Sequence, residues 1–579
     1  MLNPGTVRTR IEPIRLRING PPRLSAELRR NQQAARAGYV CPLLQRSANH
    51  HPCSRYPWAG RQPRPPRASS LAPLPSTRMS DRSTPSQPAR SAPPHYQATL
   101  IERVVDLMDP RGNVLLDLSF EEAAAAVRSG QAEQVRKIGG QFAIAQQVGK
   151  TVRMARSIGR PMRFFLAKRS EGPCLIIAER IDEIYQQLAA DGLQDQFHPS
   201  YTRMVPAHHL MELQLVGCPD PNPGLTRFFA PPRNRLPANV AAIGQRYIQQ
   251  LAEVCRGWLD QLDPRAPIGV LFSGGIDSGA LVVLLNHLLL ERGEAPQRLK
   301  AFTLAVTSPG QEVAGRGQDV EQAVTFLRQV GLEMLLEICE VPRSQVDWRA
   351  AVRAIEDYKT LDVQAATMGL TLCRAIRERY PDWRYLIDGD GGDENLKDYP
   401  IEENPELTVR SVLGNRMLYQ EGWGVNAVKH SLVYSGGQSR GHVRTAAPAR
   451  LFGFAGFSPY ATPDVIEVAE AIPFVELTHW DHERLYQLKG QVVAAGIQAV
   501  TGVEMPIFEK RRFQQGAVTQ PAFDALFPPA EASYRIAFQS LFSDPGELAV
   551  SPAAGWPRDE QQDEQQDEPP ATGAPAGQP

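Results

Sequence analysis

The chain has 579 residues, enough for about two to four domains and for a substantial hydrophobic core. Its seven cysteines lie far apart and form no CxxC pair, which excludes a disulfide scaffold and a zinc knuckle and favours a reducing compartment. Lysine plus arginine and aspartate plus glutamate each total 63, but residues 1–94 hold 16 arginines, no lysine and 3 acidic residues. The neutral total therefore conceals a basic first segment and an acidic remainder.

Both ends of the chain have the composition of disordered segments. Residues 1–94 are rich in Pro, Arg and Ser and lack spaced apolar residues, so burial could not offset the entropy lost on ordering them. Met79 offers an alternative translation start within this segment. Residues 546–579 pass through the acidic run DEQQDEQQDE and are predicted to be a solvated tail. We expect no chemistry at either end.

No stretch of the sequence has the features of a membrane anchor or an export signal. The most apolar run, residues 279–290, contains Asn286 and His287 and is shorter than the roughly 20 residues that a bilayer span needs. The basic start of the chain lacks the apolar run of about 7–15 residues that a secretory signal requires. The sequence therefore predicts a soluble, cytoplasmic protein.

Between the two ends, the pattern predicts two folded domains. Residues 95–235 contain short runs such as TVRMAR and CLIIAE, separated by glycine, proline and charge clusters, which indicates a small α/β domain rich in strands. In residues 236–545, apolar runs typical of buried strands alternate with long helical patterns. This alternation predicts the α/β class, with a doubly wound, Rossmann-like parallel sheet in the second domain.

The sharpest chemical signal is SGGIDS, where an apolar strand pattern runs through small residues into a helix. Glycines let the backbone approach a ligand closely, and successive N–H groups at a helix N-terminus suit a pyrophosphate. The serine hydroxyls can donate further hydrogen bonds, and the aspartate can hold the Mg²⁺ that accompanies a nucleotide. The residues predicted to contact the nucleotide are Ser273, Gly274, Gly275, Asp277, Ser278 and, in a later loop, Gly391.

The run SGGIDS is the PP-loop signature, so the chain resembles the ATP pyrophosphatases, which cleave ATP between the α and β phosphates and adenylate a substrate. With three further blocks, the chain resembles the synthetase half of asparagine synthetase over roughly residues 240–540. The second block, AIEDY at 354–358, is similar to a family helix whose glutamate acts as base toward the amine. The resemblance implies that role for Glu356, and a merely solvated side chain is the alternative.

The third block, LIDGDGGDE at 386–394, is similar to the SGEGSDE or SGGGADE motif of the family. The resemblance places Asp393 on the aspartate that helps to bind Mg²⁺ and pyrophosphate, so the implied metal ligands are Asp277 and Asp393. A parallel sheet gathers its ligands at the carboxyl ends of its strands, where this loop is expected. Residues 395–399 replace the FGGY of the family, so we expect this loop to pack differently.

The fourth block, PIFEKRRFQQG at 506–516, is similar to the P…RxKxxFxxG segment of the family. The resemblance implies that Lys510 neutralises charge on the α-phosphate and on the tetrahedral intermediate. The run at 456–460 lacks the arginine and aspartate of the family's RxPFLD, so the surface that binds the acceptor is expected to differ.

The runs GGQFAIA, MARSIGRPMRFF and IAE resemble the later part of a class II glutaminase domain. The earlier part of that pattern is missing: Cys41 and Cys53 lack the CGI context, and Ser157 replaces the usual aspartate. A glutaminase needs an N-terminal thiol as its nucleophile, so we expect this truncated domain not to hydrolyse glutamine. β-Lactam synthetases and lasso-peptide macrolactam cyclases also resemble this arrangement.

The sequence therefore predicts an ATP-dependent, AMP-forming amide ligase with ATP and Mg²⁺ as cofactors. Its partners would be a small-molecule or peptide carboxylate and ammonia or an amine, without a membrane or nucleic acid, and a homodimer is compatible with the sequence. Three alternatives stay open: a macrolactam or β-lactam forming cyclase, an inactive binding module of this fold, and a PP-loop RNA-modifying enzyme that uses the arginine-rich arm.

Overall fold

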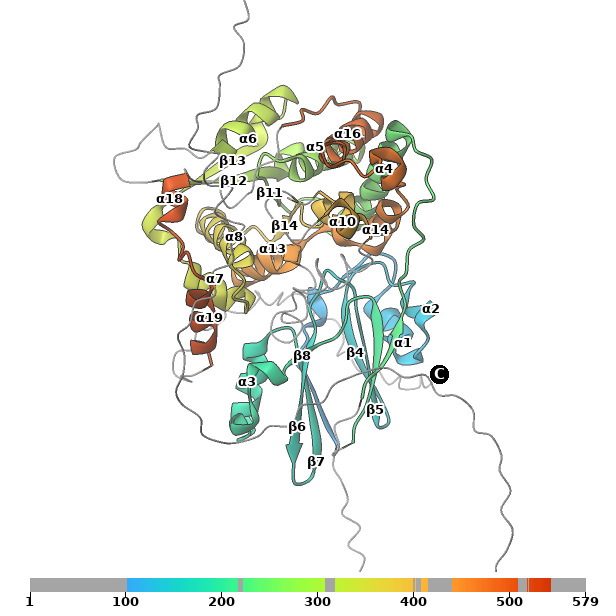
Figure 1. Cartoon of the computed structure of the whole chain (residues 1–579), viewed down its shortest axis with the longest axis vertical. Coiled ribbons are helices and arrows are strands. Elements are labelled where there is room, and N and C mark those ends of the chain that lie inside the picture. Colours follow the sequence, from blue (N-terminus) through green and yellow to red (C-terminus); the bar gives the residue numbers. More distant parts are fainter. Residues whose placement is uncertain are drawn as a thin grey trace, which may run out of the picture. The chain divides into compact units, whose positions relative to one another are not determined.

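The computed structural model describes residues 102–216, 222–307, 318–398, 401, 408–414, 440–508, 518 and 520–542 (Figure 1). All of them belong to one unit of the chain, which begins at His95. The two predicted disordered ends and the predicted site residue Lys510 lie outside the described residues. We call residues 102–229 the N-terminal region and residues 236–542 the C-terminal region.

The N-terminal region contains two four-stranded sheets, ordered β1-β7-β6-β8 and β10-β9-β5-β4, and a two-stranded β2-β3 ladder. Met154 and Met211 of one sheet pack against Phe164 and Leu175 of the other, so the sheets lie face to face. The elements are β1 Arg103–Asp106, β2 Val114–Leu115, α1 Phe120–Ser129, α2 Ala132–Val135, β3 Gly140–Gln141, β4 Ala143–Val148, β5 Thr151–Arg156, β6 Arg163–Arg169, β7 Gly172–Ala178, α3 Ile181–Ala190, β8 Arg203–Met204, β9 His209–Gln214 and β10 Gly224–Arg227.

Strand β7 is buried along its whole length because it is covered on both faces. Leu175 and Ile177 face the second sheet, whereas Cys174 and Ile176 pack with Ile184 of α3. The alternation of successive side chains between the two faces of a strand explains this division.

The C-terminal region is built on a five-stranded sheet ordered β13-β12-β11-β14-β15, in which every neighbouring pair is parallel. In chain order, β12 and β13 are added on one side of β11, and β14 and β15 are added on its other side. The winding therefore reverses between β11 and β14. This confirms the predicted doubly wound parallel sheet, and ligands of such sheets bind at that switch point. The strands are β11 Ile268–Leu271, β12 Leu299–Thr307, β13 Leu336–Pro342, β14 Tyr385–Ile387 and β15 Ala455–Phe457.

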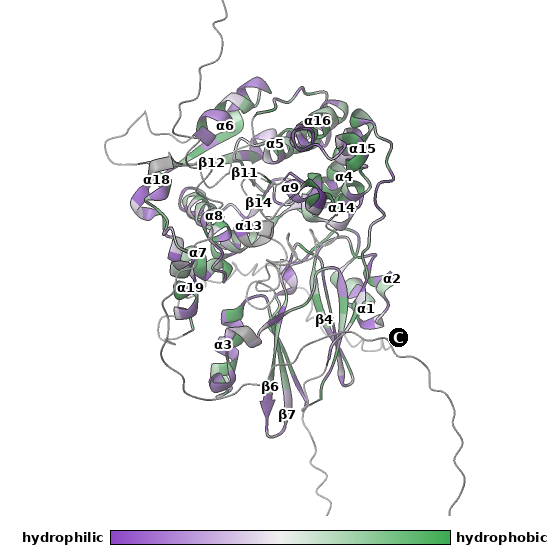
Figure 2. Cartoon of the chain, viewed as in Figure 1, coloured by the Kyte–Doolittle hydropathy of each residue, from purple (hydrophilic) through white to green (hydrophobic). Residues whose placement is uncertain are grey.

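The helices of the C-terminal region pack around this sheet, and in Figure 2 helices such as α7 alternate between hydrophobic and hydrophilic residues. None of the helices in the described part of the chain is long and apolar enough to cross a bilayer. The helices are α4 Val240–Leu259, α5 Ile276–Glu291, α6 Gln318–Gln329, α7 Trp348–Ile355, α8 Thr360–Arg379, α9 Gly392–Leu396, α10 Val409–Gly414, α13 Arg440–Leu451, α14 Pro463–Glu470, α15 Phe474–Thr478, α16 His482–Thr501, α18 Gln520–Asp524 and α19 Glu531–Ser540.

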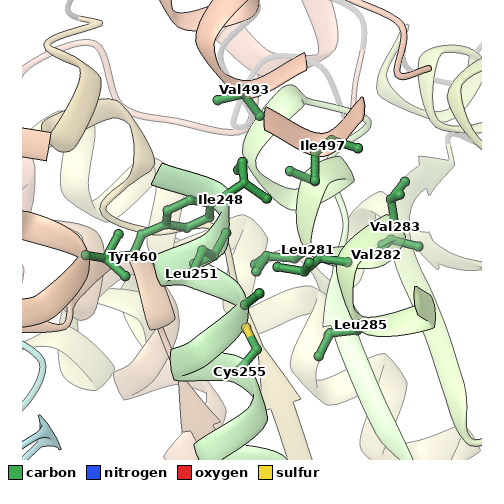
Figure 3. Close-up of a cluster of buried hydrophobic side chains, with 14 of the residues drawn as sticks. Ile248, Leu251, Cys255, Leu281, Val282, Val283, Leu285, Tyr460, Val493 and Ile497 are labelled. Atoms are coloured by element: carbon green, nitrogen blue, oxygen red, sulfur yellow. The ribbon is translucent and has the colours of Figure 1, made fainter. Parts of the chain in front are cut away.

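Helices α4, α5 and α16 contribute side chains to one apolar cluster (Figure 3). Leu281 and Leu285 of α5 are fully buried, as is Ile497 of α16. Helices α4 and α16 approach closely because glycines face each other: a Cβ atom on Gly244 would lie 2.3 Å from the carbonyl oxygen of Val492. This packing fixes α16, which carries a charged residue of the candidate site.

Candidate functional site

The SGGIDS run forms the loop between β11 and α5, so the predicted strand, loop and helix are all present. Gly274 has a φ of 75°, and a Cβ atom there would lie 2.8 Å from the backbone nitrogen of Ala323. The Ser278 hydroxyl oxygen lies 3.3 Å from both the backbone nitrogen and the hydroxyl oxygen of Ser273. The N-cap residue of α5, Gly275, provides no side-chain hydrogen bond to the first turn. The N–H groups of that turn are therefore suited to bind an anion.

A second loop follows β14 and packs directly onto the first turn of α5. A Cβ atom on Gly392 would lie 2.4 Å from the carboxyl carbon of Asp277, and one on Gly389 would lie 3.1 Å from the backbone nitrogen of Ser278. The glycines of this loop thus permit the close approach that brings Asp393 to Asp277. Gly391, with a φ of 99°, caps α9 and faces Ala461.

Lys489 of α16 joins the predicted metal ligands. Its Nζ atom donates hydrogen bonds to Asp277, at 2.5 Å, and to Asp393, and lies 3.4 Å from a carboxylate oxygen of Asp398. The Lys489 side chain is only 4% exposed. Burial favours a neutral lysine, but the attraction of the three carboxylates outweighs it and raises the pKa of Lys489 well above its usual value.

Lys489 was not among the site residues predicted from the sequence. A signal was present, because this lysine is flanked by Leu485, Leu488 and Val492 of the helix, all buried. A lysine on the apolar side of a helix is rare unless it is paired. Its carboxylate partners come from distant parts of the chain, so the pairing itself could not be read from helical spacing.

Asp277 and Asp393 are the predicted carboxylate donors of a Mg²⁺ site. Burial raises the pKa of Asp277 to about 6, against the opposing effect of Lys489, and its Oδ1 atom is buried without a hydrogen-bond partner. Among the described residues, no group of three or more His, Cys, Asp or Glu side chains is arranged to hold a metal ion. Two carboxylates fit Mg²⁺ bound to a nucleotide, which takes its remaining ligands from phosphates and water.

Two more acids, Asp388 and Asp390, lie in the loop after β14. Burial raises the pKa of Asp388 to about 7, and burial together with the charge of Asp388 raises the pKa of Asp390 well above its usual value. The hydroxyl group of Thr445 donates to Asp390, and the N–H of Asp390 donates to Asp388 at 3.0 Å. This loop was predicted from the sequence, but a role for these two acids was not.

The two segments that depart from the family pattern meet beside the SGGIDS loop. Asn395 donates to the carbonyl oxygen of Tyr460 at 2.8 Å, and the Tyr460 hydroxyl group donates to the carbonyl oxygen of Asp277 at 3.1 Å. Tyr460 therefore supports the loop directly, and Asn395 supports it through Tyr460.

Glu356 is not part of this cluster. Its carboxylate is buried and accepts hydrogen bonds from the backbone N–H groups of Ile181 and Asp182, at the start of α3. The structure thus brings together Asp277, Asp393 and the SGGIDS loop. Glu356 instead packs against the N-terminal region, through its hydrogen bonds to α3. Its role as base stays a prediction, as does the role of Lys510.

Comparison with known proteins agrees with this arrangement. The family model described as asparagine synthase matches residues 259–451, which include both loops of the site. The chain is similar to the glutamine-hydrolyzing asparagine synthetase B of Escherichia coli (strain K12), with 26% identity over 187 residues. The match covers 28% of this chain and 31% of that protein, less than a third of the relative's length. Residues 259–451 thus carry a domain that matches the asparagine synthase family model.

Proposed function

We propose that the chain is an ATP-dependent, AMP-forming amide ligase, which activates a carboxylate as an acyl-adenylate and passes it to ammonia or an amine. The observation that carries this proposal is the meeting of an uncapped helix N-terminus at the SGGIDS loop with Asp277, Asp393 and the buried Lys489. Backbone N–H groups and a lysine are donors for a pyrophosphate, and paired carboxylates are ligands for its metal ion. The asparagine synthase domain supports the same reaction class.

In the first half-reaction, the substrate carboxylate attacks the α-phosphorus of ATP and pyrophosphate leaves toward the SGGIDS loop. Asp277 and Asp393 would hold Mg²⁺, which neutralises phosphate charge when bound. Lys489 would turn from the carboxylates toward the phosphate oxygens, and Lys510 is proposed to neutralise charge at the α-phosphate. In the second half-reaction, the amine attacks the acyl carbonyl carbon, AMP leaves, and the amine loses a proton.

Two carboxylates are candidates for accepting that proton. Glu356 is the one predicted from the sequence, but amide donors of α3 already occupy both of its oxygens. Asp390 lies in the loop that packs on the SGGIDS helix, and its raised pKa suits a group that exchanges protons. These observations favour Asp390 as the acceptor of the amine proton.

ATP–pyrophosphate exchange, measured with a panel of small carboxylic acids and peptides, tests the proposal. We expect exchange with at least one acid. Asp277→Asn should abolish exchange, because the Mg²⁺ that accompanies the leaving pyrophosphate would lose a protein ligand. Lys489→Met should lower the exchange rate by about 10²–10³, the usual loss for one preorganised electrostatic group. Asp260→Asn is the matched control, since Asp260 forms a surface ion pair with Arg292.

Asp390→Asn should retain exchange and lower amide formation by roughly 10²–10⁴, because only the second half-reaction needs a proton acceptor. The proposed ligase would be contradicted if no acid of the panel supported exchange and the protein did not bind ATP. That outcome would support the inactive binding module instead.

A further inference from the structure

Helices α3 and α7 meet end to end, one from each region of the chain. Arg180, the N-cap residue of α3, donates hydrogen bonds to the carbonyl oxygens of Ala354, at 2.7 Å, and Arg353, at 3.0 Å, in the last turn of α7. A cation at a helix C-terminus satisfies carbonyl groups that lack partners within the helix and complements the helix dipole. Arg180 therefore caps a helix of the other region.

Glu356 makes the reciprocal contact. It is the C-cap residue of α7, has a φ of 51°, and is 1% exposed. One carboxylate oxygen accepts the N–H of Ile181 at 2.7 Å, and the other accepts the N–H of Asp182 at 2.8 Å. An anion here complements the N-terminus of α3, as the arginine complements the C-terminus of α7. Each helix end is thus capped by a charged residue adjoining the other helix.

The charge balance explains how a carboxylate tolerates this burial. Arg180 lies 3.5 Å from one Glu356 oxygen, and Arg163 of β6 lies 3.9 Å from the other. A buried ion is tolerated when it is paired and hydrogen-bonded, but removing a partner leaves polar groups unsatisfied. Arg180 keeps its ion pair with Asp182 at 2.6 Å when Glu356 is lost, whereas the N–H groups of Ile181 and Asp182 lose the carboxylate that they bind. The pair should therefore be sensitive to the loss of either member.

Apolar packing surrounds the same contact. Ile181, the first residue of α3, is fully buried in a cluster whose other fully or nearly fully buried members, such as Val352, Ile355 and Tyr534, belong to the C-terminal region. The amide donors that bind Glu356 are thus held in place by packing. A fixed position of this kind is a feature of a structural contact rather than of a group that must move to meet a substrate.

We propose that these two helix ends form a joint that makes the N-terminal region a structural part of the ligase, with Glu356 as a joint residue rather than the proton acceptor. The joint reaches the candidate site through neighbouring elements: α8 begins four residues after Glu356, and its Asp362 accepts a hydrogen bond from Arg444 at 3.2 Å. The next residue, Thr445, donates to Asp390. The activity readout below rests on the proposed function, whereas the unfolding readout does not.

The test compares Glu356→Gln, Arg180→Met and the control Arg328→Met in the full chain. Arg328 of α6 forms an exposed ion pair with Glu333 and belongs to neither α3 nor α7. A joint predicts that Glu356→Gln and Arg180→Met each lower the thermal unfolding midpoint by about 5 °C or more, while the control stays within about 1 °C. It also predicts that the double variant loses less than the sum of the single losses, because both changes break one contact.

The pH profile of amide formation distinguishes the joint from a proton acceptor. If Glu356 were the acceptor, Glu356→Gln would remove the acidic limb of the profile, and Arg180→Met would leave exchange intact. The joint predicts that both variants keep the shape of the profile and lose exchange and amide formation by the same factor. An unchanged midpoint in both variants, or a loss of amide formation alone in Glu356→Gln, would overturn the proposal.

Discussion

At the scale of single residues, the loop after β14 contains a buried carboxyl group, Asp388, whose pKa is raised. Asp388 is 4% exposed, and burial raises its pKa to about 7, although hydrogen bonds from Ser458 and from the backbone of Asp390 act in the opposite direction. A carboxyl group with a raised pKa binds its proton more tightly in the folded than in the unfolded protein. Its contribution to stability therefore falls as the pH rises from about 4 to about 7.

Asp388→Asn should remove the cost of burying an ionised carboxylate, because an amide carries no charge. Its amide oxygen can still accept the hydrogen bond from the Asp390 N–H group. At pH 8 we expect the free energy of unfolding to increase by about 1–3 kcal/mol. The gain should shrink as the pH falls to 5, where the native carboxyl group is protonated. Urea unfolding at both pH values measures it, and an equal gain at pH 5 and pH 8 would contradict the assignment.

At the scale of elements, the apolar runs predicted most of the strands. IGVLFS and WRYLIDG contain β11 and β14, and KAFTLAV lies within β12, because strands buried on both faces read as continuous apolar runs. TVRMAR and CLIIAE likewise correspond to β5 and β7. Contacts between distant elements were not predictable, since neither the Lys489 cluster nor the α3 partner of Glu356 leaves a local spacing signal.

The crossing of α4 and α16 leads to a prediction at this scale. A Cβ atom on Gly496 would lie 2.2 Å from the carbonyl oxygen of Gly244, so Gly496→Ala must push the helices apart. We expect a loss of about 1–3 kcal/mol in stability and weaker ATP binding, because α16 carries Lys489. Unfolding and calorimetric titration with ATP measure the two effects.

Gly257→Ala on α4 is the control, because its Cβ atom would meet the Leu116 side chain at an ordinary 3.6 Å. This variant should be neutral or stabilising by up to about 1 kcal/mol, the usual helix preference for alanine over glycine. Equal behaviour of the two variants would show that the close crossing does not position Lys489.

For the whole molecule, we predict that a chain of residues 95–545 folds and keeps full activity. All six apolar clusters lie within residues 104–542, and the composition of residues 1–94 offers little apolar surface to bury. Circular dichroism, thermal unfolding and the exchange assay compare this chain with the full one. A lower unfolding midpoint after removal of residues 1–94 would show that this segment packs on the rest.

The order of strands in the parallel sheet has a consequence for synthesis of the chain. β11 ends at Leu271, its neighbour β14 begins at Tyr385, and Lys489 comes later still. At the usual ribosomal speed, roughly 10–40 s separate the SGGIDS loop from the lysine that completes its charge balance. The proposed ATP site is incomplete during that interval, so ATP binding cannot contribute to assembly of the sheet in the nascent chain.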